Sequence, residues 1–178
     1  MHERARDAAI THEILATHDP LTGLGNRRLL AERLAASLAH ARRNKSVVAV
    51  AYLDLDGFKL INDTLGHAVG DTLLKLVARR LESVVRKEDT VARVGADEFM
   101  VALWQVANIA DVENVATKLV EMVSRPYVIE EYTVRVTLSA GIGIYPAHGD
   151  DAESLMKAAD GALYDAKRAG KNAFRISP

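Results

Sequence analysis

Two adjacent carboxylates beside a glycine-containing turn are the residues in this sequence best suited to chemistry. Asp97 and Glu98 directly follow Gly95 and Ala96, and short apolar runs flank the four residues on both sides. A glycine-containing pair between two such runs is a signal for a β-hairpin. Carboxylates fixed at a hairpin bend could hold a metal ion, whereas the same residues taken alone would form an ordinary solvated turn. The choice between these interpretations depends on what the rest of the chain brings to the bend.

A third carboxylate and three lysines could complete a site for a phosphorylated ligand. Asp54 ends a continuous apolar run typical of a strand buried on both faces, and the ends of such strands commonly carry the sites of open α/β sheets. Carboxylates hold Mg²⁺ together with phosphate oxygens, and lysines can neutralise the outer phosphates. The lysines are Lys59, Lys167 and Lys171. Taken singly, Asp54 could instead be a strand terminator or helix cap, and each lysine an exposed surface charge.

The composition restricts the class of protein. The 178 residues are 49% hydrophobic, which is enough for one domain with a full core. The absence of cysteine excludes disulfides and thiolate metal sites, and leaves oxygen-ligated metals as the natural option. A net charge of −1 provides no overall basic field for nucleic acid or an anionic membrane. The longest apolar run, residues 47–53, is far shorter than the roughly 20 residues that span a bilayer, and no signal peptide precedes it. We therefore expect a cytoplasmic domain without direct membrane insertion.

Apolar periodicity divides the chain into helices and strands without an internal repeat. A spacing of three to four residues predicts helices, and short apolar runs predict strands. We expect helices at residues 1–17, 27–44, 71–85, 108–124 and 153–169. We expect strands at residues 47–54, 90–94, 98–104, 127–129, 132–145 and 173–176. Asn26 and Asp71 are expected to cap the helices that follow them, because short polar side chains accept hydrogen bonds from the first free amides.

The first of these helices has a very thin apolar stripe, formed by Ile10 and Ile14. A helix with so little apolar surface is not stable alone. We expect it to continue a helix from an upstream segment, and the chain to be part of a longer protein.

Six blocks along the chain, in order, resemble the GGDEF domain, the family of diguanylate cyclases. The resemblance extends from Asp19 to about Ile176, and its signature reads Gly-Ala-Asp-Glu-Phe at residues 95–99. The matching blocks are residues 19–28, 54–59 with 62–63, 66–71, 93–99, 140–143 and 159–172. Residues 1–17 would be an N-terminal linker (signalling) helix, and residues 18–178 the GGDEF domain.

The resemblance implies an α/β (α+β) fold similar to class III nucleotidyl cyclases and polymerase palm domains, with a central, mixed, mainly antiparallel five-stranded sheet flanked by helices. The implied reaction condenses two GTP molecules into cyclic di-GMP and two pyrophosphates. It takes place across a homodimer, with two Mg²⁺ or Mn²⁺ ions per active site. The implied context is a multidomain signalling protein with a fused upstream sensor and, in hybrids, a downstream EAL phosphodiesterase domain.

The resemblance also assigns roles to individual residues. Asp54 and Asp97 match metal-binding carboxylates, and Leu55 would add its backbone carbonyl. Glu98 matches a carboxylate required for catalysis, either at the metal or in deprotonating the 3′-hydroxyl; both roles remain open. The remaining substrate positions are the guanine-reading pair Asn62 and Asp71, the turn residues Gly95 and Ala96, and the phosphate contacts Lys59, Lys167 and Lys171. The family more often has arginine at the last position, so weaker phosphate binding is expected there.

Four further interpretations concern product inhibition, the signature turn, the overall function and packing. Arg86 and Asp89 match the spacing of the family's inhibitory product site, although an Arg and Asp three apart can also be a simple surface ion pair. Ala96 replaces the second glycine of the signature, where a left-handed backbone would cost an L-residue roughly 1–2 kcal/mol. The resemblance, together with this departure, leaves two functions open. One is a diguanylate cyclase with product feedback inhibition, and the other is a catalytically weak GTP-binding domain that regulates a fused EAL domain. The residues expected to have structural roles are Phe58, His67, Phe99, Trp104 and Tyr164.

Overall fold

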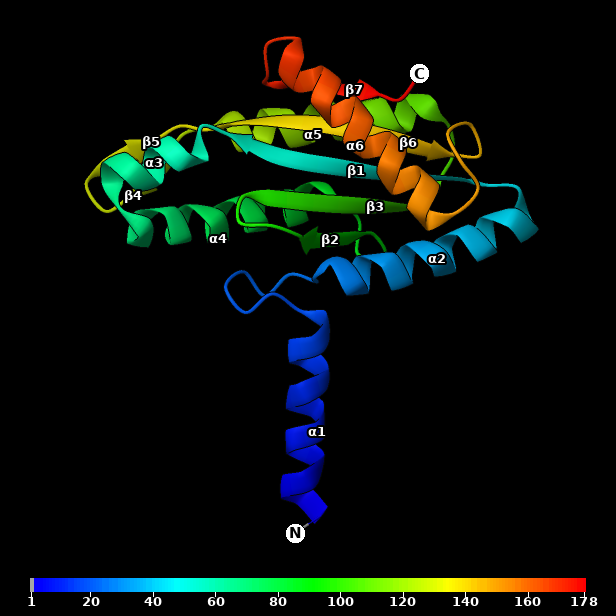
Figure 1. Ribbon diagram of the computed structural model, residues 1–178, viewed down its shortest axis with the longest axis horizontal. Coiled ribbons are helices and arrows are strands. Elements are labelled where there is room, and N and C mark those ends of the chain that lie inside the picture. The colour runs from blue at the N-terminus through cyan, green and yellow to red at the C-terminus, as the bar shows by residue number, and fades with distance from the viewer. Residues whose placement is uncertain (1) are drawn as a thin grey trace.

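A computed structural model of the chain describes residues 2–178 and contains one five-stranded sheet covered by helices on both faces (Figure 1). The strand order is β2-β3-β1-β6-β7, and only the β6–β7 pair is parallel. The helices are α1 (His2–Thr17), α2 (Arg27–Asn44), α3 (Phe58–Leu65), α4 (His67–Val84), α5 (Ile109–Ser124) and α6 (Ala152–Arg168). The strands are β1 (Val47–Asp56), β2 (Thr90–Arg93), β3 (Glu98–Val106), β4 (Tyr127–Ile129), β5 (Tyr132–Val134), β6 (Thr137–Tyr145) and β7 (Ala173–Ile176). The predicted mixed, mainly antiparallel sheet flanked by helices is confirmed.

Strand β1 lies at the centre of the sheet and separates two hydrophobic clusters. Successive side chains of a strand point to opposite faces. Ala49, Leu53 and their alternating neighbours therefore pack against α4 and α5, whereas Val48 and Val50 pack against α2 and α6. The residues that continue the second series are Tyr52 and Asp54. The pleat thus directs the side chain of Asp54 to the same face of the sheet as α6.

Helix α6 lies unusually close to strand β6, because two glycines remove side chains from the contact. A β-carbon at Gly141 would lie 2.0 Å from the backbone nitrogen of Leu163 and 2.1 Å from the carbonyl oxygen of Ala159. Gly143 faces the same helix, with a β-carbon position 2.5 Å from the carbonyl oxygen of Leu155. These approaches fix where the C-terminal end of α6, which carries Lys167, meets the sheet.

Most of the predicted helices and strands are confirmed, with three corrections. Asn26 caps α2 as expected, accepting a hydrogen bond from the amide of Leu29. Asp71 does not cap its helix: α4 begins at His67 after Gly66, so Asp71 lies inside the second turn. The sequence from residue 58 to 65, which had no predicted element, forms helix α3.

The third correction concerns a strand. The single strand predicted at 132–145 is divided into β5 and β6, and β5 pairs with β4 in a separate hairpin. Tyr164 is 61% exposed, so it is not a core residue; its ring is covered by the guanidinium of Arg168, 5.7 Å from the ring centroid. Phe58 and Phe99 are buried as expected.

Helix α1 projects away from the sheet and its helices (Figure 1). It buries none of its residues, and Ile10 and Ile14 are each about half exposed, at 50% and 51%. The helix is joined to the domain by hydrogen bonds at its C-terminal end, including one from the amide of Asn26 to the carbonyl of Thr17. Among residues 2–178, no helix is long and apolar enough to cross a membrane.

Candidate active site

The bend between β2 and β3 places its carboxylates beside the end of β1. The register pairs Arg93 with Phe99 and Asp54 with Glu98. Across the bend, the amide of Val94 donates to the carbonyl of Glu98 at 2.9 Å. The amide of Leu55 donates to the carbonyl of Asp97 at 3.1 Å, which ties the bend to β1. The bend is therefore wider than a two-residue turn, and it is fixed to the central strand by backbone hydrogen bonds.

A cleft of about 170 Å³ at this edge contains six of the predicted site residues. The metal-binding candidates Asp54, Leu55 and Asp97 line it together with the phosphate-binding candidates. The full lining consists of Asp54, Leu55, Asp56, Gly57, Phe58, Lys59, Asp97, Lys167 and Lys171. The lysines come from α3, the end of α6 and the loop before β7, so only the tertiary structure brings them to one place.

The electrostatics of the cleft favour a bound cation. Burial raises the pKa of Asp54, although hydrogen bonding and the charge of Lys167 oppose this effect. Burial likewise raises the pKa of Asp97, and the neighbouring charge of Asp54 adds to it. Burial by itself lowers the pKa of Lys167, but the hydrogen bond and charge of Asp54 outweigh it, so this pKa is raised. A lysine ammonium therefore compensates one of two carboxylates whose charges are costly in this site.

The donor set fits a divalent cation that arrives with a nucleotide. Among residues 2–178, no group of three or more His, Asp or Glu side chains is arranged to hold a metal. Mg²⁺ is commonly bound through only one or two carboxylates, with phosphate oxygens and waters as its other ligands. Asp54 and Asp97 provide such a pair, and the lysines beside them suit the phosphates.

The predicted guanine-reading residues lie outside this cleft, on α3 and α4. The side chain of Asn62 packs against Gly70, where a β-carbon would lie 1.8 Å from its Oδ1. This oxygen is buried and has no hydrogen-bond partner among residues 2–178. Asp71, next to Gly70, is exposed. The packing of α3 on α4 thus brings Asn62 beside the residue that precedes Asp71.

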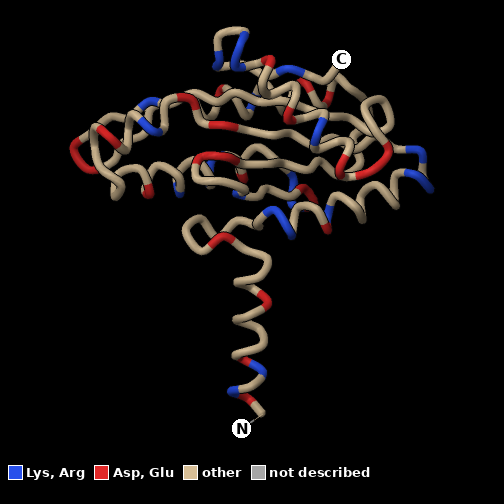
Figure 2. Tube along the Cα trace, in the orientation of Figure 1, with Lys and Arg blue, Asp and Glu red and all other residues tan. Residues whose placement is uncertain are grey.

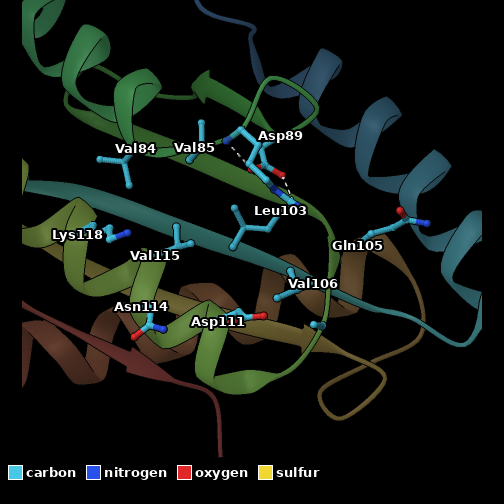
Figure 3. A pocket seen from close by; sticks show the side chains of 12 residues that line it. Val84, Val85, Asp89, Leu103, Gln105, Val106, Asp111, Asn114, Val115 and Lys118 are labelled. Atoms are coloured by element: carbon cyan, nitrogen blue, oxygen red, sulfur yellow. Dashed lines mark hydrogen bonds and ion pairs between the residues drawn. The ribbon is translucent and has the colours of Figure 1, made fainter.

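Arg86 and Asp89 form a compact arrangement after the end of α4, and Figure 3 shows Asp89 at this position. The Asp89 side chain is only 2% exposed, and it accepts from the backbone amides of Arg86 and Trp104, each at 2.8 Å. The Arg86 guanidinium contacts both Asp89 oxygens at 3.3 Å, and its side chain is 51% exposed. Asp89 therefore shapes the connection and orients Arg86, and this pair is not a solvated surface ion pair.

A pocket of about 380 Å³ lies beside this pair (Figure 3). Much of its lining is apolar, and Lys118 and Asn114 from α5 contribute to it (Figure 3). The sequence interpretation did not include these two residues, since a lone Lys and Asn on a helix give no signal. Elsewhere, Lys and Arg are interspersed with Asp and Glu over the whole trace (Figure 2), in keeping with the net charge of −1.

The backbone at Ala96 differs from the expected conformation. Neither Gly95 nor Ala96 has a positive φ, so an L-residue meets no left-handed strain there. Ala96 is exposed, and its carbonyl accepts from Arg93 at 2.8 Å, while the same guanidinium contacts Asp19 at 3.1 Å. The expected cost of roughly 1–2 kcal/mol is therefore wrong, because the wider bend turns without a left-handed residue.

Asp56 is a further residue of the cleft that the sequence interpretation left out. Its carboxylate accepts from the hydroxyls of Thr137 and Ser139, at 2.6 and 2.7 Å, and from the amide of Asn172 at 3.1 Å. These bonds connect the end of β1 to β6 and to the loop that carries Lys171. The spacing of two aspartates on one strand, Asp54 and Asp56, was the available signal.

Known proteins match this chain over most of its length. The family model described as "Diguanylate cyclase, GGDEF domain" matches residues 16–173. The bifunctional diguanylate cyclase/cyclic di-GMP phosphodiesterase MucR of Pseudomonas aeruginosa is 46% identical over 160 residues, covering 90% of this chain. The cyclic di-GMP phosphodiesterase NbdA of the same organism is 39% identical over 158 residues, covering 89% of this chain.

The fold also matches solved structures of GGDEF domains. The GGDEF domain of TpbB from Pseudomonas aeruginosa has a TM-score of 0.88 and 40% identity, covering 90% of this chain and 94% of that one. The chain spans only 23% of MucR and 20% of NbdA, so these relatives carry much additional sequence. The family match extends over nearly the whole chain, and this chain belongs to the GGDEF domain family of diguanylate cyclases.

Proposed function

We propose that this domain condenses two GTP molecules into cyclic di-GMP, releasing two pyrophosphates. The observation that carries the proposal is the cleft that collects Asp54, Asp97 and the lysines from separate elements at the end of β1. Such a set of carboxylates and ammonium groups matches the needs of a metal-bound triphosphate. The names of the relatives MucR and TpbB, both including diguanylate cyclase, agree with this reaction.

In this proposal, Asp54, Asp97 and the carbonyl of Leu55 would hold Mg²⁺ or Mn²⁺, two ions per site. The metal supplies charge stabilisation for the attacking and leaving oxygens of an in-line displacement. Lys167 neutralises Asp54 in the free protein. With a metal-bound nucleotide in the cleft, Lys167 would be free to contact phosphate oxygens, and Lys59 and Lys171, which line the same cleft, would neutralise the phosphates with it.

The base is read by Asn62 and Asp71, whose oxygens accept from the donors on the Watson–Crick edge of guanine. The buried Oδ1 of Asn62 supports this role, because a buried acceptor without a partner is costly, and a turn of the amide toward a bound base would remove that cost. Adenine lacks the corresponding pair of donors, so GTP is preferred to ATP.

Each domain binds one GTP, and a homodimer brings the two nucleotides together. The 3′-hydroxyl of each GTP attacks the α-phosphorus of the other, so two P–O bonds form and two pyrophosphates leave. Glu98, beside Asp54, either receives the hydroxyl proton or completes the metal ligands.

Product would inhibit the reaction by binding at Arg86 and Asp89. The exposed guanidinium can address O6 and N7 of guanine bidentately, and Asp89 holds it in place for that contact. Calorimetry of cyclic di-GMP with Arg86→Ala tests this site: binding as tight as that of the wild type contradicts it.

The test of the proposed function is product formation by the purified chain, alone and fused to a dimerising coiled coil, with GTP and Mg²⁺. Cyclic di-GMP in the wild type, and its loss in Asp97→Asn with an unchanged circular dichroism spectrum, is the expected result. ATP in place of GTP should yield no cyclic product. GTP binding without product in the dimerised wild type overturns the proposal.

That last outcome would support a second candidate, a catalytically weak GTP-binding domain that regulates a fused EAL phosphodiesterase. The observation favouring it is that NbdA, 39% identical, is named as a phosphodiesterase. In either case we propose a cytoplasmic domain of a larger signalling protein, in which α1 connects residues 18–178 to an upstream sensor.

A further inference from the structure

Tyr52 reaches Glu98 from the neighbouring strand. On β1, Tyr52 lies two positions before Asp54 and therefore on the same face of the sheet. Glu98 pairs with Asp54 in the register, so Tyr52 is its diagonal neighbour across the two strands. The Tyr52 hydroxyl donates to Oε2 of Glu98 at 2.7 Å, a short hydrogen bond to a charged acceptor.

Arg27 determines the direction of this hydrogen bond. Its guanidinium donates to the Tyr52 oxygen at 3.1 Å and lies 5.9 Å from the centroid of the tyrosine ring. Because the phenol oxygen accepts from Arg27, its single hydrogen is left to point at Glu98. Burial raises the pKa of Tyr52, and the hydrogen bond to Glu98 adds to this, so the phenol stays protonated at neutral pH.

The Glu98 carboxylate is confined from a second side by the backbone. A β-carbon at Gly95 would lie 3.0 Å from its Oε2 and 3.1 Å from its Cδ. The side chain is thus folded over Gly95 with one oxygen on Tyr52. Among residues 2–178, Tyr52 is the side chain that donates a hydrogen bond to this carboxylate. Oε1 is left for the metal or for a substrate hydroxyl.

We infer that Tyr52 is a positioning residue for the condensation: with Arg27 behind it, its hydroxyl holds Oε2 of Glu98 so that Oε1 faces the reacting groups. The inference rests on the proposed function, and it holds whether Glu98 acts as base or as metal ligand. Neither role needs Tyr52 to touch the nucleotide.

The first test is the variant Tyr52→Phe, which keeps the ring that packs beside the buried cluster of α2 and α6. We expect kcat to fall about tenfold, as for the loss of one hydrogen bond to a charged group. KM for GTP should stay within about twofold, since the lysines and Asn62 are untouched. The matched control is Tyr145→Phe, because Tyr145 packs beside the same cluster at the far end of the sheet. A kcat of Tyr52→Phe equal to that of Tyr145→Phe overturns the inference.

A double-mutant cycle with Arg27→Gln separates orientation from simple packing. If Arg27 acts through Tyr52, then Arg27→Gln should lower kcat in the wild-type background and have little further effect in Tyr52→Phe. Additive losses in the two variants contradict the proposed arrangement.

A second readout does not depend on turnover. The free energies of unfolding of the wild type, Tyr52→Phe, Glu98→Gln and the double variant form a second cycle, measured in urea without metal or nucleotide. Because the Tyr52 hydroxyl donates to Glu98, we expect the two substitutions to be non-additive. Additive changes in the free energy of unfolding overturn the contact. A wild type that binds GTP and makes no cyclic di-GMP instead overturns the proposed function, and the unfolding cycle still decides whether Tyr52 holds Glu98.

Discussion

Exchange of glycine and alanine at the first two positions of the signature turn should have two different effects. Gly95→Ala should mainly lower turnover, whereas Ala96→Gly should mainly lower stability. Ala96 is exposed and has no positive φ, so its methyl group neither strains the backbone nor fills the core. Gly95 has no positive φ either, but its α-hydrogen faces the Glu98 side chain. Gly95→Ala therefore tests a steric effect on the site, and Ala96→Gly tests an effect on the conformational freedom of the unfolded chain.

The expected magnitudes follow from these surroundings. Ala96→Gly adds freedom mainly to the unfolded chain, which lowers stability by about 0.4–1 kcal/mol. For a domain of this size, this corresponds to a fall in Tm of roughly 1–4 °C. The turnover number should change by less than about threefold, because the site geometry is unaltered.

Gly95→Ala acts on the site. Its β-carbon would lie 3.0 Å from Oε2 and 3.2 Å from Cβ of Glu98, so the glutamate must move by a few tenths of an ångström. The hydrogen bond from Tyr52 resists that movement. Since a displacement of about 1 Å can cost on the order of 100-fold in rate, we expect kcat to fall roughly tenfold. The Tm should change little, because the lower freedom of the unfolded chain and the crowding of Glu98 act in opposite directions.

The assay is pyrophosphate release at saturating GTP and Mg²⁺ with the dimerised domain, together with thermal unfolding followed by circular dichroism. The reasoning is refuted if Ala96→Gly raises kcat tenfold or more, since the methyl group would then obstruct the nucleotide. It is equally refuted if Ala96→Gly raises the Tm, or if Gly95→Ala keeps full activity.

Three further predictions concern charge, base recognition and the fold. Because the folded-state pKa of Asp97 is raised, its charge costs stability as pH rises above its unfolded pKa. Asp97→Asn should therefore raise the free energy of unfolding of the metal-free domain at pH 7 by less than about 1 kcal/mol, and this gain should disappear at acid pH. The variant should also lose stabilisation by Mg²⁺ with GTP, and a lower Tm than that of the wild type at pH 7 contradicts the prediction. Gly70→Ala should weaken GTP binding in calorimetry at least about tenfold, because its β-carbon would lie 1.8 Å from Oδ1 of Asn62; unchanged affinity excludes Asn62 from base recognition. Arg80→Ala should destabilise the fold by about 1–3 kcal/mol in urea, since Arg80 lies 3.5 Å from the centroid of the Tyr127 ring and donates to the carbonyl of Met122 at 3.0 Å. Lys75→Ala, which removes an exposed cation from the same helix, is the control for charge loss, and equal effects argue against the Arg80 contacts.

The sequence determined the helices and strands that have strong local signals. Asn26 and Asn108 precede periodic apolar runs, and both cap helices in the structure. The apolar run ending at Asp54 became the central strand. Short-range signals were insufficient where tertiary contacts dominate. Helix α3 is eight residues long and is stabilised by packing on α4, and the division of 132–145 into two strands follows from β5 pairing with β4.

The candidate residues could also be named from the sequence, because carboxylates, lysines and glycines at these spacings match the family. Their arrangement in space could not be predicted from the sequence. Asp54 and Lys167 are far apart in the chain, and they meet because Gly141 and Gly143 let α6 lie directly on β6. Local sequence does not encode such an approach, since it depends on the shapes of two elements at once.

The bend at Gly95 and Ala96 shows the same division. The sequence determined that Asp97 and Glu98 would follow a chain reversal between two strands. Only the tertiary structure decided that the reversal needs no left-handed residue, and that Glu98 lies between Gly95 and the hydroxyl of Tyr52. Backbone conformation in a hairpin bend depends on the register of its strands, and here the pairing of β3 with the buried strand β1 fixes that register.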